Sequence, residues 1–397
     1  MSEKLIIKNF GPIKKVELDI RRFNILIGQQ ATGKSTVAKL LAMCRYFSYI
    51  VENTNIQQPF VDGLISWGLY ESIQEDTFIY YECNHYSFEI KRIIAKEHDR
   101  DQEGEDYEYD FPVFLSTLEA KSDEFKNLLD ELEKIRPTPV GLVSLDFGWR
   151  IPTSFFQNDV ASVIDYPFYL PAERGLQSIF SLGKNSIQNI SDSLFNQFAE
   201  LNKITLSFSD HTKIEPLDLE YRLENGKGRI RKIGSNEYFS INNAASGFQS
   251  TVPVVLLTKY YTEIRKKRKT FIIEEPELNL FPETQQKLMK FLVDKTMNFG
   301  NSILATTHSP YILTSLNNMM YAFQTGKNYS NEVESVMPKQ FWLNPNDVAA
   351  YMMLPNGECE SIIDKEGLIK TEKIDSVSSI LNKDFNAIMD IEVKSKK

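Results

Sequence analysis

The sequence has few cysteines and no long apolar run. Its three cysteines, Cys44, Cys83 and Cys359, are far apart and form no Cys-x-x-Cys pair, so the sequence indicates neither a disulfide framework nor a zinc site. The longest apolar runs, such as residues 252–257, are far shorter than the ~20 residues that a membrane-spanning helix needs. Residues 1–4 are charged and polar, unlike the apolar region of a signal peptide. We therefore expect a cytoplasmic protein with no membrane partner.

The sequence also lacks the excess of basic residues that is typical of nucleic-acid-binding proteins. Its 45 Lys and Arg against 54 Asp and Glu give a net charge of −9, whereas affinity for a phosphate backbone comes mainly from Lys and Arg. The densest basic cluster, residues 265–269, lies between a predicted helix and a predicted strand. Cations stabilise helix C-termini, so we interpret this cluster as a solvated helix end. Direct contact with DNA is the alternative, which leaves nucleic acid open as a partner.

Two further absences narrow the function. No heptad pattern of coiled-coil length occurs, which argues against a coiled-coil tether. The acidic residues near the C-terminus lack the Glu then Asp-x-Asp spacing of a Toprim nuclease site; they are Glu358, Glu360, Asp364 and Glu366. We therefore expect no intrinsic nuclease activity. Apolar residues at helical spacing over residues 374–390 predict an amphipathic helix that docks on the core or on a partner.

A phosphate-binding loop is the feature around which the chain is organised. Apolar residues 23–27 predict a strand that leads into Gly28-Gln29-Gln30-Ala31-Thr32-Gly33-Lys34-Ser35-Thr36, and a helical pattern follows. This is Gly-x-x-x-x-Gly-Lys-Ser in the strand-to-helix context that confirms a nucleotide site. Gly28 and Gly33 permit a tight turn whose N–H groups face phosphate oxygens. Lys34 can reach the β- and γ-phosphates, and the Ser35 hydroxyl can bind Mg²⁺.

Two later strand ends supply residues suited to ATP hydrolysis. Apolar residues 271–273 end in Glu274-Glu275-Pro276-Glu277. Beside a phosphate loop, this junction predicts that Glu274 binds Mg²⁺ and that Glu275 polarises the attacking water as general base. A strand over residues 302–307 ends in His308, whose imidazole can bond the γ-phosphate or the attacking water. We interpret Glu275, His308 and Lys34 as the catalytic residues.

The remaining pattern predicts the surrounding elements. Strands are expected over residues 5–7, 16–20 and 167–170, a hairpin over 78–81 and 86–90, and a strand pair over 219–223 and 229–233. Helices are expected over 60–72, 114–135, 191–201, 251–261 with Pro253 in its first turn, and 282–298. The acidic segment over residues 96–110 lacks an EF-hand frame, and we interpret it as a solvated loop. Glu173 and Arg174, just past a strand end, are suited either to a nucleotide or to a structural ion pair.

The set of motifs resembles the ABC-class ATPases. It comprises residues 28–35, Ser246-Gly247-Phe248-Gln249, residues 273–277 with Asn279-Leu280-Phe281-Pro282, and Thr307-His308-Ser309-Pro310. Within that class the sequence is similar to the branch of RecF, SMC proteins and the overcoming-lysogenisation-defect nucleases, of the AAA_21 and AAA_15 type. It is more similar still to the stand-alone ATPases of anti-phage systems such as Septu, PARIS and retron cassettes. Residues 9–12 and 171–174 are also similar to that group.

The resemblance implies an α/β ABC-type P-loop ATPase head, with a mixed sheet core, an antiparallel β subdomain and a helical insertion. Residues 1–94 and 165–320 would form the two parts of the ATPase domain, residues 95–164 an acidic and helical insertion, and residues 321–397 a C-terminal extension. A head-to-head homodimer or a higher homo-oligomer is implied. In it, two ATP molecules lie between the phosphate loop of one head and Ser246, Gly247 and Gln249 of the other, and Asn279 belongs to the loop linking the two sites.

The sequence departs from the pattern of that class at three points. Glu274 stands where most members have Asp, as it does in the anti-phage group, and the signature is the degenerate Ala-Ser-Gly-Phe-Gln. No clear glutamine loop is present, and the candidates for that role are Gln57, Gln58 and the region of Arg174.

The function implied is an ATP-hydrolysing ATPase that senses or controls a separately encoded effector, a nuclease or toxin, in bacterial anti-phage defence. The alternative is a RecF-like repair ATPase that binds duplex DNA directly. A third interpretation is a scaffold in which ATP is structural and is not hydrolysed.

Overall fold

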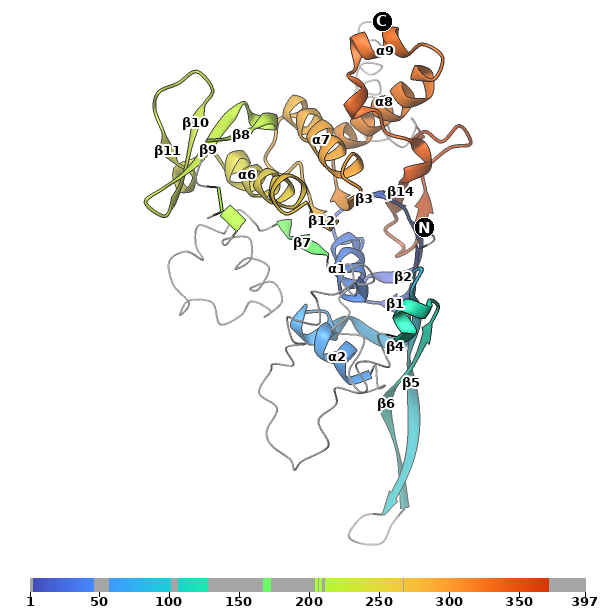
Figure 1. Ribbon diagram of the computed structural model, residues 1–397. Helices are drawn as coiled ribbons and strands as arrows, with labels where there is room; N and C mark the ends of the chain where they lie inside the picture. The colour runs from blue at the N-terminus through green and yellow to red at the C-terminus, as the bar shows by residue number, and fades with distance from the viewer. Residues whose placement is uncertain are drawn as a thin grey trace, which may run out of the picture.

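The computed structural model describes residues 3–45, 57–100, 106–127, 167–172, 204–205, 207–208, 211–266 and 268–370. These residues form three sheets and the helices that pack on them (Figure 1). The predicted helices over 191–201 and 374–390, together with Glu173 and Arg174, lie outside the described residues. Within the described part of the chain, no helix combines the length and the apolar character that crossing a membrane requires.

The central sheet is almost entirely parallel and has the order β15-β14-β3-β13-β12-β7. Its strands are β3 (Phe23–Gly28), β7 (Phe168–Leu170), β12 (Thr270–Glu274), β13 (Ser302–Thr307), β14 (Val348–Met353) and the antiparallel edge strand β15 (Cys359–Ser361). Parallel strands that are covered on both faces are near-continuous apolar runs, as β3 and β12 are. Because β3, β13 and β12 are neighbours, the phosphate loop, His308 and Glu274 all follow strands at one edge of the sheet.

Two apolar cores cover the two faces of this sheet. Alternate residues of β3 belong to different cores: Ile25 packs with α6 (Ser246–Lys259), α7 (Pro282–Met297) and α8 (Pro310–Gly326), whereas Leu26 packs with α1 (Lys34–Arg45). The antiparallel sheet packs on the far side of α1 and shares that second core. The chain is therefore layered, with α1 held between two sheets (Figure 1).

The antiparallel sheet has the order β2-β1-β4-β5-β6 and confirms the strands and the hairpin expected near the N-terminus. Its strands are β1 (Glu3–Phe10), β2 (Ile13–Ile20), β4 (Ile73–Glu82), β5 (Tyr86–Arg100) and β6 (Asp106–Ala120). The helix α2 (Gln57–Ser66) and the 3₁₀ turn Tyr70–Ser72 replace the single helix expected over residues 60–72. Gly68, with φ of +66°, separates the two pieces, because a left-handed residue cannot continue a helix.

Two expectations for residues 96–135 are wrong. Residues 96–100 and 106–110 are strand rather than loop, and the helix expected from residue 114 begins as strand, because β6 continues to Ala120 and pairs with β5 along its whole length. That pairing gives the backbone ladder bonds that local helix propensity cannot offset. Only residues 123–127 of the predicted helix are helical, and residues 128–166 lie outside the described part. β5 and β6 form a long ribbon that extends from the body (Figure 1).

The third sheet lies near the start of α6 and has the order β11-β10-β9-β8. It contains β8 (Thr212–Ile214), β9 (Leu219–Glu224), β10 (Lys227–Lys232) and β11 (Phe239–Ser240), which confirms the expected strand pair. The remaining elements are α9 (Ser330–Val336), the π-turn Tyr260–Ile264, and 3₁₀ turns at Glu215–Leu217, Ile241–Asn243, Lys339–Phe341 and Pro345–Asp347.

The helix α6 begins earlier than expected. It starts at Ser246, so Pro253 lies in its interior and not in its first turn. Proline has no N–H group to donate to the preceding turn. The helix continues nonetheless, because buried residues on both sides of Pro253 pack into the core beneath the sheet.

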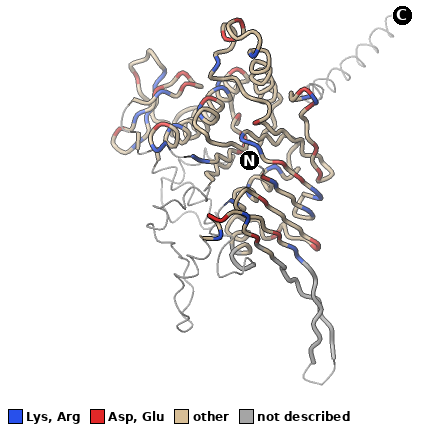
Figure 2. Tube along the Cα trace, turned by 45° about the vertical axis from the view of Figure 1, so that its right-hand side comes forward, with Lys and Arg blue, Asp and Glu red and all other residues tan. Residues whose placement is uncertain are grey.

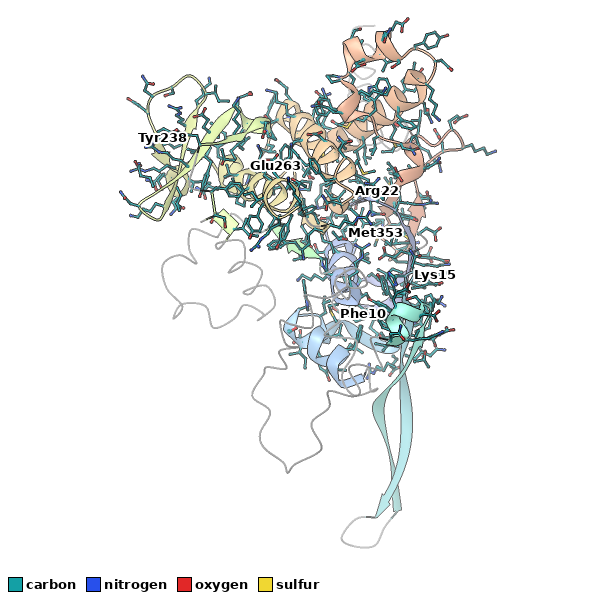
Figure 3. All side chains as sticks on the ribbon, viewed as in Figure 1. Phe10, Lys15, Arg22, Tyr238, Glu263 and Met353 are labelled. Atoms are coloured by element: carbon teal, nitrogen blue, oxygen red, sulfur yellow. The ribbon has the colours of Figure 1, made fainter. Side chains whose placement is uncertain are left out.

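The segment after residue 320, expected to lie outside the ATPase domain, contributes two strands to the central sheet. β14 lies beside β3, with Met353 opposite Gly28. The turn that follows β14 contacts the N-terminal hairpin, where Gly357 O accepts from Lys14 N at 2.8 Å and from Lys15 N at 3.0 Å. Met353, the last residue of β14, belongs to the apolar core that lies between the central sheet and the antiparallel sheet (Figure 3). Residues 348–361 are thus part of the phosphate-loop structure.

Replacing Gly357 with Ala should destabilise the whole fold. Gly357 has φ of +80°, and a Cβ there would lie 2.6 Å from Pro12 O and 2.7 Å from Lys14 N. The control Gly226→Ala has a similar φ of +71° but open space around its Cβ, so it carries only backbone strain of about 1–2 kcal/mol. We expect Gly357→Ala to cost about 1–3 kcal/mol more, because the clash involves backbone that cannot move freely. Chemical denaturation measures both, and equal costs would contradict the docking of this turn.

Candidate nucleotide-binding site

The phosphate loop connects the end of β3 to the first residue of α1. Ala31 and Gly33 have positive φ angles of 60° and 91°, which give the loop its tight curvature. Glycine is also required by packing, because a Cβ on Gly28 would lie 2.5 Å from Met353 O, and one on Gly33 would lie 2.9 Å from Ile13 Cγ1. Thr32 Oγ1 donates to Gln29 O at 2.8 Å and closes the turn. The loop geometry is that of an anion-binding turn at a helix N-terminus.

The side chain of Lys34 folds back over the phosphate loop. Its Nζ donates to Gly28 O at 3.0 Å and to Gln29 O at 2.7 Å, and the side chain is buried. Burial lowers the pKa of the Lys34 ammonium, while the charges of Glu275, Glu277 and Glu274 act to raise it. Three carboxylates therefore act electrostatically on this lysine.

The residues around Lys34 are accessible to a ligand. Gln29, Gln30, Ala31 and Ser35 are exposed, and Thr36 is half-buried. The first turn of α1 contains no acidic residue, so its positive dipole end is available to phosphate.

The two carboxylates of the acidic strand end differ in burial. Glu274, the last residue of β12, is 4% exposed, and its Oε2 accepts from Ala172 N at 3.4 Å. Glu275 has φ of 42°, and its N–H donates to Thr306 O at 2.9 Å. Its side chain is 31% exposed, and Oε1 lies 3.4 Å from His308 Nε2. The structure thus brings together Glu275 and His308, which the sequence placed on separate strands.

The donor set beside the loop fits a magnesium ion. Ser35 offers an exposed hydroxyl, and Glu274 offers a carboxylate at the end of β12, which β13 separates from β3 in the sheet. Mg²⁺ prefers oxygen ligands and is commonly held by one or two protein groups together with waters and substrate phosphates. No cluster of three or more His, Cys, Asp or Glu suited to a metal occurs among the residues described.

The residues predicted to form the signature lie at the start of α6, whose buried residues belong to the core on the opposite face of the sheet from α1. Ser246 is exposed, and a Cβ on Gly247 would lie 2.6 Å from Asn279 O. Gln249 Nε2 donates to Asn242 O at 3.1 Å and to Ala244 O at 2.9 Å, so its amide group is bonded within the chain.

The start of α6 is joined to the loop that follows β12. Ser250 Oγ donates to Leu278 O at 3.0 Å, and Asn279 in the same loop has φ of 60°. The close approach of Gly247 to Asn279 makes the signature and this loop one packed unit.

Sequence reasoning gave no role to Glu277, although this residue is in the acidic motif. Its Oε1 accepts from Thr307 Oγ1 at 2.6 Å and from His308 N at 2.9 Å. A third acidic residue in a turn fixed by Pro276 was the available signal, but burial is not visible in a local pattern. The glutamine-loop candidates remain untested, because Arg174 and the side chains of Gln57 and Gln58 lie outside the described part.

The basic cluster over residues 265–269 is partly packed on aromatic rings. Arg265 Nε donates to Tyr260 OH at 2.7 Å, and Lys269 Nζ lies 5.2 Å from the centroid of the Tyr261 ring. Lys and Arg are interspersed with Asp and Glu over the described chain (Figure 2). Arg265 directly follows the π-turn Tyr260–Ile264, as expected of a cation at a helix end, while Arg265, Lys266 and Arg268 are exposed.

A protein-family model, AAA_15, described as the AAA ATPase domain, matches residues 1–138 and 72–313 of the chain. No curated protein sequence matches this chain. Among solved structures, the SMC head domain from Thermotoga maritima is 13% identical with a TM-score of 0.38, and the comparison covers 91% of this chain and 98% of that chain. An SMC head with an extended coiled coil, bound to the C-terminal domain of ScpA and derived from Pyrococcus furiosus, is 10% identical with a TM-score of 0.39, covering 96% and 99%.

A dimeric ATP-binding cassette in a post-hydrolysis state, bound to ADP and phosphate, is 11% identical with a TM-score of 0.30, covering 90% of this chain and 98% of that chain. These TM-scores are low, so the assignment rests on the family match and on the strand order and loop geometry described above. The expected fold class, an α/β P-loop ATPase head with a mixed core sheet and an antiparallel subdomain, is confirmed. Its helical insertion stays a prediction.

Proposed function

The chain belongs to the AAA ATPase domain family, and on that premise we propose that it hydrolyses ATP with Glu275 as the general base. The observation that carries this proposal is the 3.4 Å contact between Glu275 Oε1 and His308 Nε2, at strand ends that adjoin the phosphate loop. A carboxylate that is partly exposed and lies beside an imidazole can accept a proton from a water held between them and the nucleotide. His308 would orient that water or the γ-phosphate.

The phosphate loop would hold the nucleotide through groups that now bond within the chain. Lys34 would exchange the carbonyls of Gly28 and Gln29 for the β- and γ-phosphate oxygens, which are stronger partners because they are charged. Ser35 and Glu274 would hold Mg²⁺, and the bound ion supplies neutralisation of phosphate charge.

We propose that two copies of the chain close head to head on ATP. Ser246 is exposed at the N-terminus of α6, whose first turn contains no acidic residue. A helix N-terminus of this kind attracts phosphate. In one chain this helix packs on the face of the sheet opposite α1, which supports a site completed by a second copy, with Ser246 and Gly247 facing the partner's γ-phosphate.

The output that we propose is control of a separately encoded effector, a nuclease or toxin, in anti-phage defence in the cytoplasm. The support is the resemblance of the Glu274-Glu275-Pro276-Glu277 motif to the ATPases of that group. The net charge of −9 favours a protein partner over direct DNA binding.

Mass photometry tests this assembly. We expect wild-type protein to form a dimer or larger species on addition of ATP and Mg²⁺, and we expect Glu275→Gln to hold it longer, because the nucleotide is not consumed. The protein encoded by the neighbouring gene should co-assemble with that species. A mass that does not respond to ATP would remove dimer closure from the proposal, and ATP-dependent binding to duplex DNA without any protein partner would favour the repair alternative.

A further inference from the structure

The turn after β12 holds a third carboxylate, which the proposed mechanism does not use. Glu277 is 8% exposed, and its Oε1 accepts hydrogen bonds from Thr307 Oγ1 at 2.6 Å and from His308 N at 2.9 Å. Both donors lie at the end of β13, whereas Glu277 follows Glu275 by two residues. The Glu277 carboxylate therefore links the turn after β12, which holds the proposed base Glu275, to the end of β13, which is followed by His308.

Two consecutive turns place Glu277 at this position. Leu278 N donates to Glu275 O at 3.0 Å, in a turn whose second residue is Pro276, a preferred residue there. Leu280 N donates to Glu277 O at 2.9 Å, and Asn279 in that turn has φ of 60°. The backbone on both sides of Glu277 is thus fixed by local bonds, and its side chain is directed to β13.

The backbone N–H of His308 needs the Glu277 acceptor because His308 lies beyond the last residue of β13 that pairs with β3. The last pair between β13 and β3 is Thr307 with Ile27, so the next N–H group requires another partner when buried. An ionised carboxylate is a strong acceptor for it. Glu277 Oε2 is buried without a hydrogen-bond partner among the residues described, so the two bonds at Oε1 and the nearby positive charge of Lys34 offset the cost of burying this group.

Hydrogen bonds fix the backbone on both sides of His308, whereas its ring is partly exposed. Thr307 Oγ1 accepts from Ser309 N at 2.9 Å, and Ser309 Oγ donates to Gln285 Oε1 at 2.6 Å. Gln285 Nε2 in turn donates to Leu280 O at 2.9 Å, which returns the network to the loop after Glu277. The side chain of His308 stays 32% exposed and contacts Glu275.

We propose that Glu277 is a positioning residue that fixes the His308 backbone, so that the imidazole is directed at Glu275 and at the γ-phosphate of bound ATP. The inference rests on the proposed function, because the role of His308 does. Glu277 touches neither substrate nor metal in this assignment. It acts by limiting the positions that the ring can adopt, and small displacements of a catalytic group are costly in rate.

Three variants test the proposal against a matched control. Glu277→Ala removes the acceptor, and Glu277→Gln keeps a carbonyl oxygen in place without the charge. Thr307→Val removes one donor to Glu277 together with the acceptor of Ser309 N. The control is Glu283→Gln on α7, where the side chain is 71% exposed. We expect Glu277→Ala to lower kcat by about tenfold or more while the Kd for ATP with Mg²⁺ stays within about twofold. Glu277→Gln should recover part of the loss, and the control should match wild type.

A spectroscopic readout separates this inference from the proposed function. The chain has four histidines, so the ring signals of His308 can be assigned by substitution and followed by NMR without nucleotide. Glu277→Ala and Thr307→Val should each shift the His308 ring signals, and the double variant should shift them by less than the sum of the two single effects. This result is expected even if wild-type protein fails to hydrolyse ATP, in which case only the proposed function is lost.

Two results would overturn the positioning role. One is a folded Glu277→Ala or Thr307→Val protein whose His308 signals and kcat match wild type. The other is a variant that loses ATP binding together with kcat, since that outcome places Glu277 in the phosphate site itself. If Glu277→Ala does not fold, Glu277→Gln and Thr307→Val carry the same comparison, because each keeps the size and shape of the side chain.

Discussion

Replacing Glu275 with Gln should lower the kcat for ATP hydrolysis at least about 100-fold, while the affinity for ATP changes little. The amide has the shape of the carboxylate and can still contact His308 Nε2, but it cannot accept a proton from the attacking water. General-base catalysis contributes about 10²–10⁴-fold, and this variant removes only that term. Phosphate release measures kcat, and calorimetric titration with ATP and Mg²⁺ measures the affinity.

The matched control for this prediction is Glu334→Gln, which removes one exposed carboxylate on α9. It should leave both kcat and affinity unchanged. Equal rates for wild type and Glu275→Gln would contradict the assignment of the base, and they would favour the scaffold interpretation, in which hydrolysis has no part. A loss of both rate and affinity would place Glu275 in ground-state binding instead.

The position of the candidate site in the fold could be predicted because it depends on short motifs at strand ends. A phosphate loop fixes Gly28, Gly33 and Lys34 by local backbone requirements, and a strand that ends in acidic residues is visible as an abrupt change of polarity. The side-by-side placement of β12 and β13 is a long-range pairing, of Glu274 with Thr306. Sequence spacing alone does not determine which strands are neighbours, so the contact between Glu275 and His308 emerges only from the fold.

The elements that were missed are held by partners distant in the sequence. β14 is a short apolar stretch of a type that periodicity cannot assign, and it is a strand because β3 pairs with it. β6 is a strand because β5 pairs with it along its length. The start of α6 was missed because the helix was expected only from residue 251, with Pro253 in its first turn, whereas Gly247 permits an earlier turn of helix to approach Asn279. The role of Glu277 was missed for the same reason, because it depends on Thr307, which is distant in the sequence.

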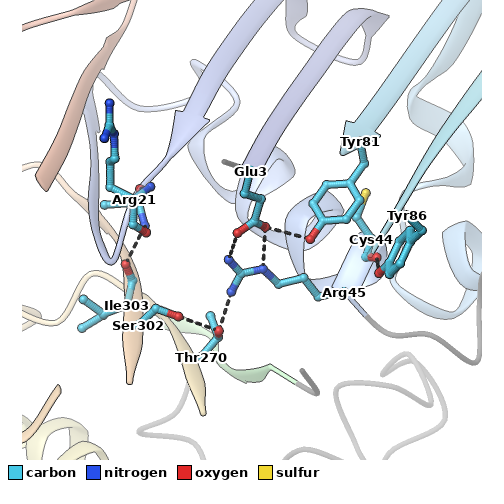
Figure 4. Close-up of polar contacts among 10 residues, drawn as sticks. Glu3, Arg21, Cys44, Arg45, Tyr81, Tyr86, Thr270, Ser302 and Ile303 are labelled. Atoms are coloured by element: carbon cyan, nitrogen blue, oxygen red, sulfur yellow. Dashed lines mark hydrogen bonds and ion pairs between the residues drawn. The ribbon is translucent and has the colours of Figure 1, made fainter. Parts of the chain in front are cut away.

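A buried ion pair at the far end of α1 connects the phosphate loop to both sheets. Arg45, the last residue of α1, donates from Nε to Glu3 Oε1 at 2.8 Å and from its terminal nitrogens to Glu3 Oε2 and Thr270 Oγ1 (Figure 4). Tyr81 OH donates to the same Glu3 oxygen at 2.8 Å, and Thr270 Oγ1 lies 2.7 Å from Ser302 Oγ. Strands β1, β4, β12 and β13 are all joined through this one guanidinium.

Replacing Arg45 with Met should therefore lower the free energy of unfolding by about 3 kcal/mol, because it leaves the Glu3 carboxylate, which is only 15% exposed, without its cation. The double variant Arg45→Met with Glu3→Gln should recover much of the loss, since the uncompensated charge is then removed. Lys126→Met is the control: it breaks an exposed pair with Asp123, which is worth about 0–1 kcal/mol. Denaturant unfolding measures all three. If Arg45→Met cost no more than Lys126→Met, the two sheets would have to be held to α1 by apolar packing alone, and the phosphate loop would not depend on this pair for its placement.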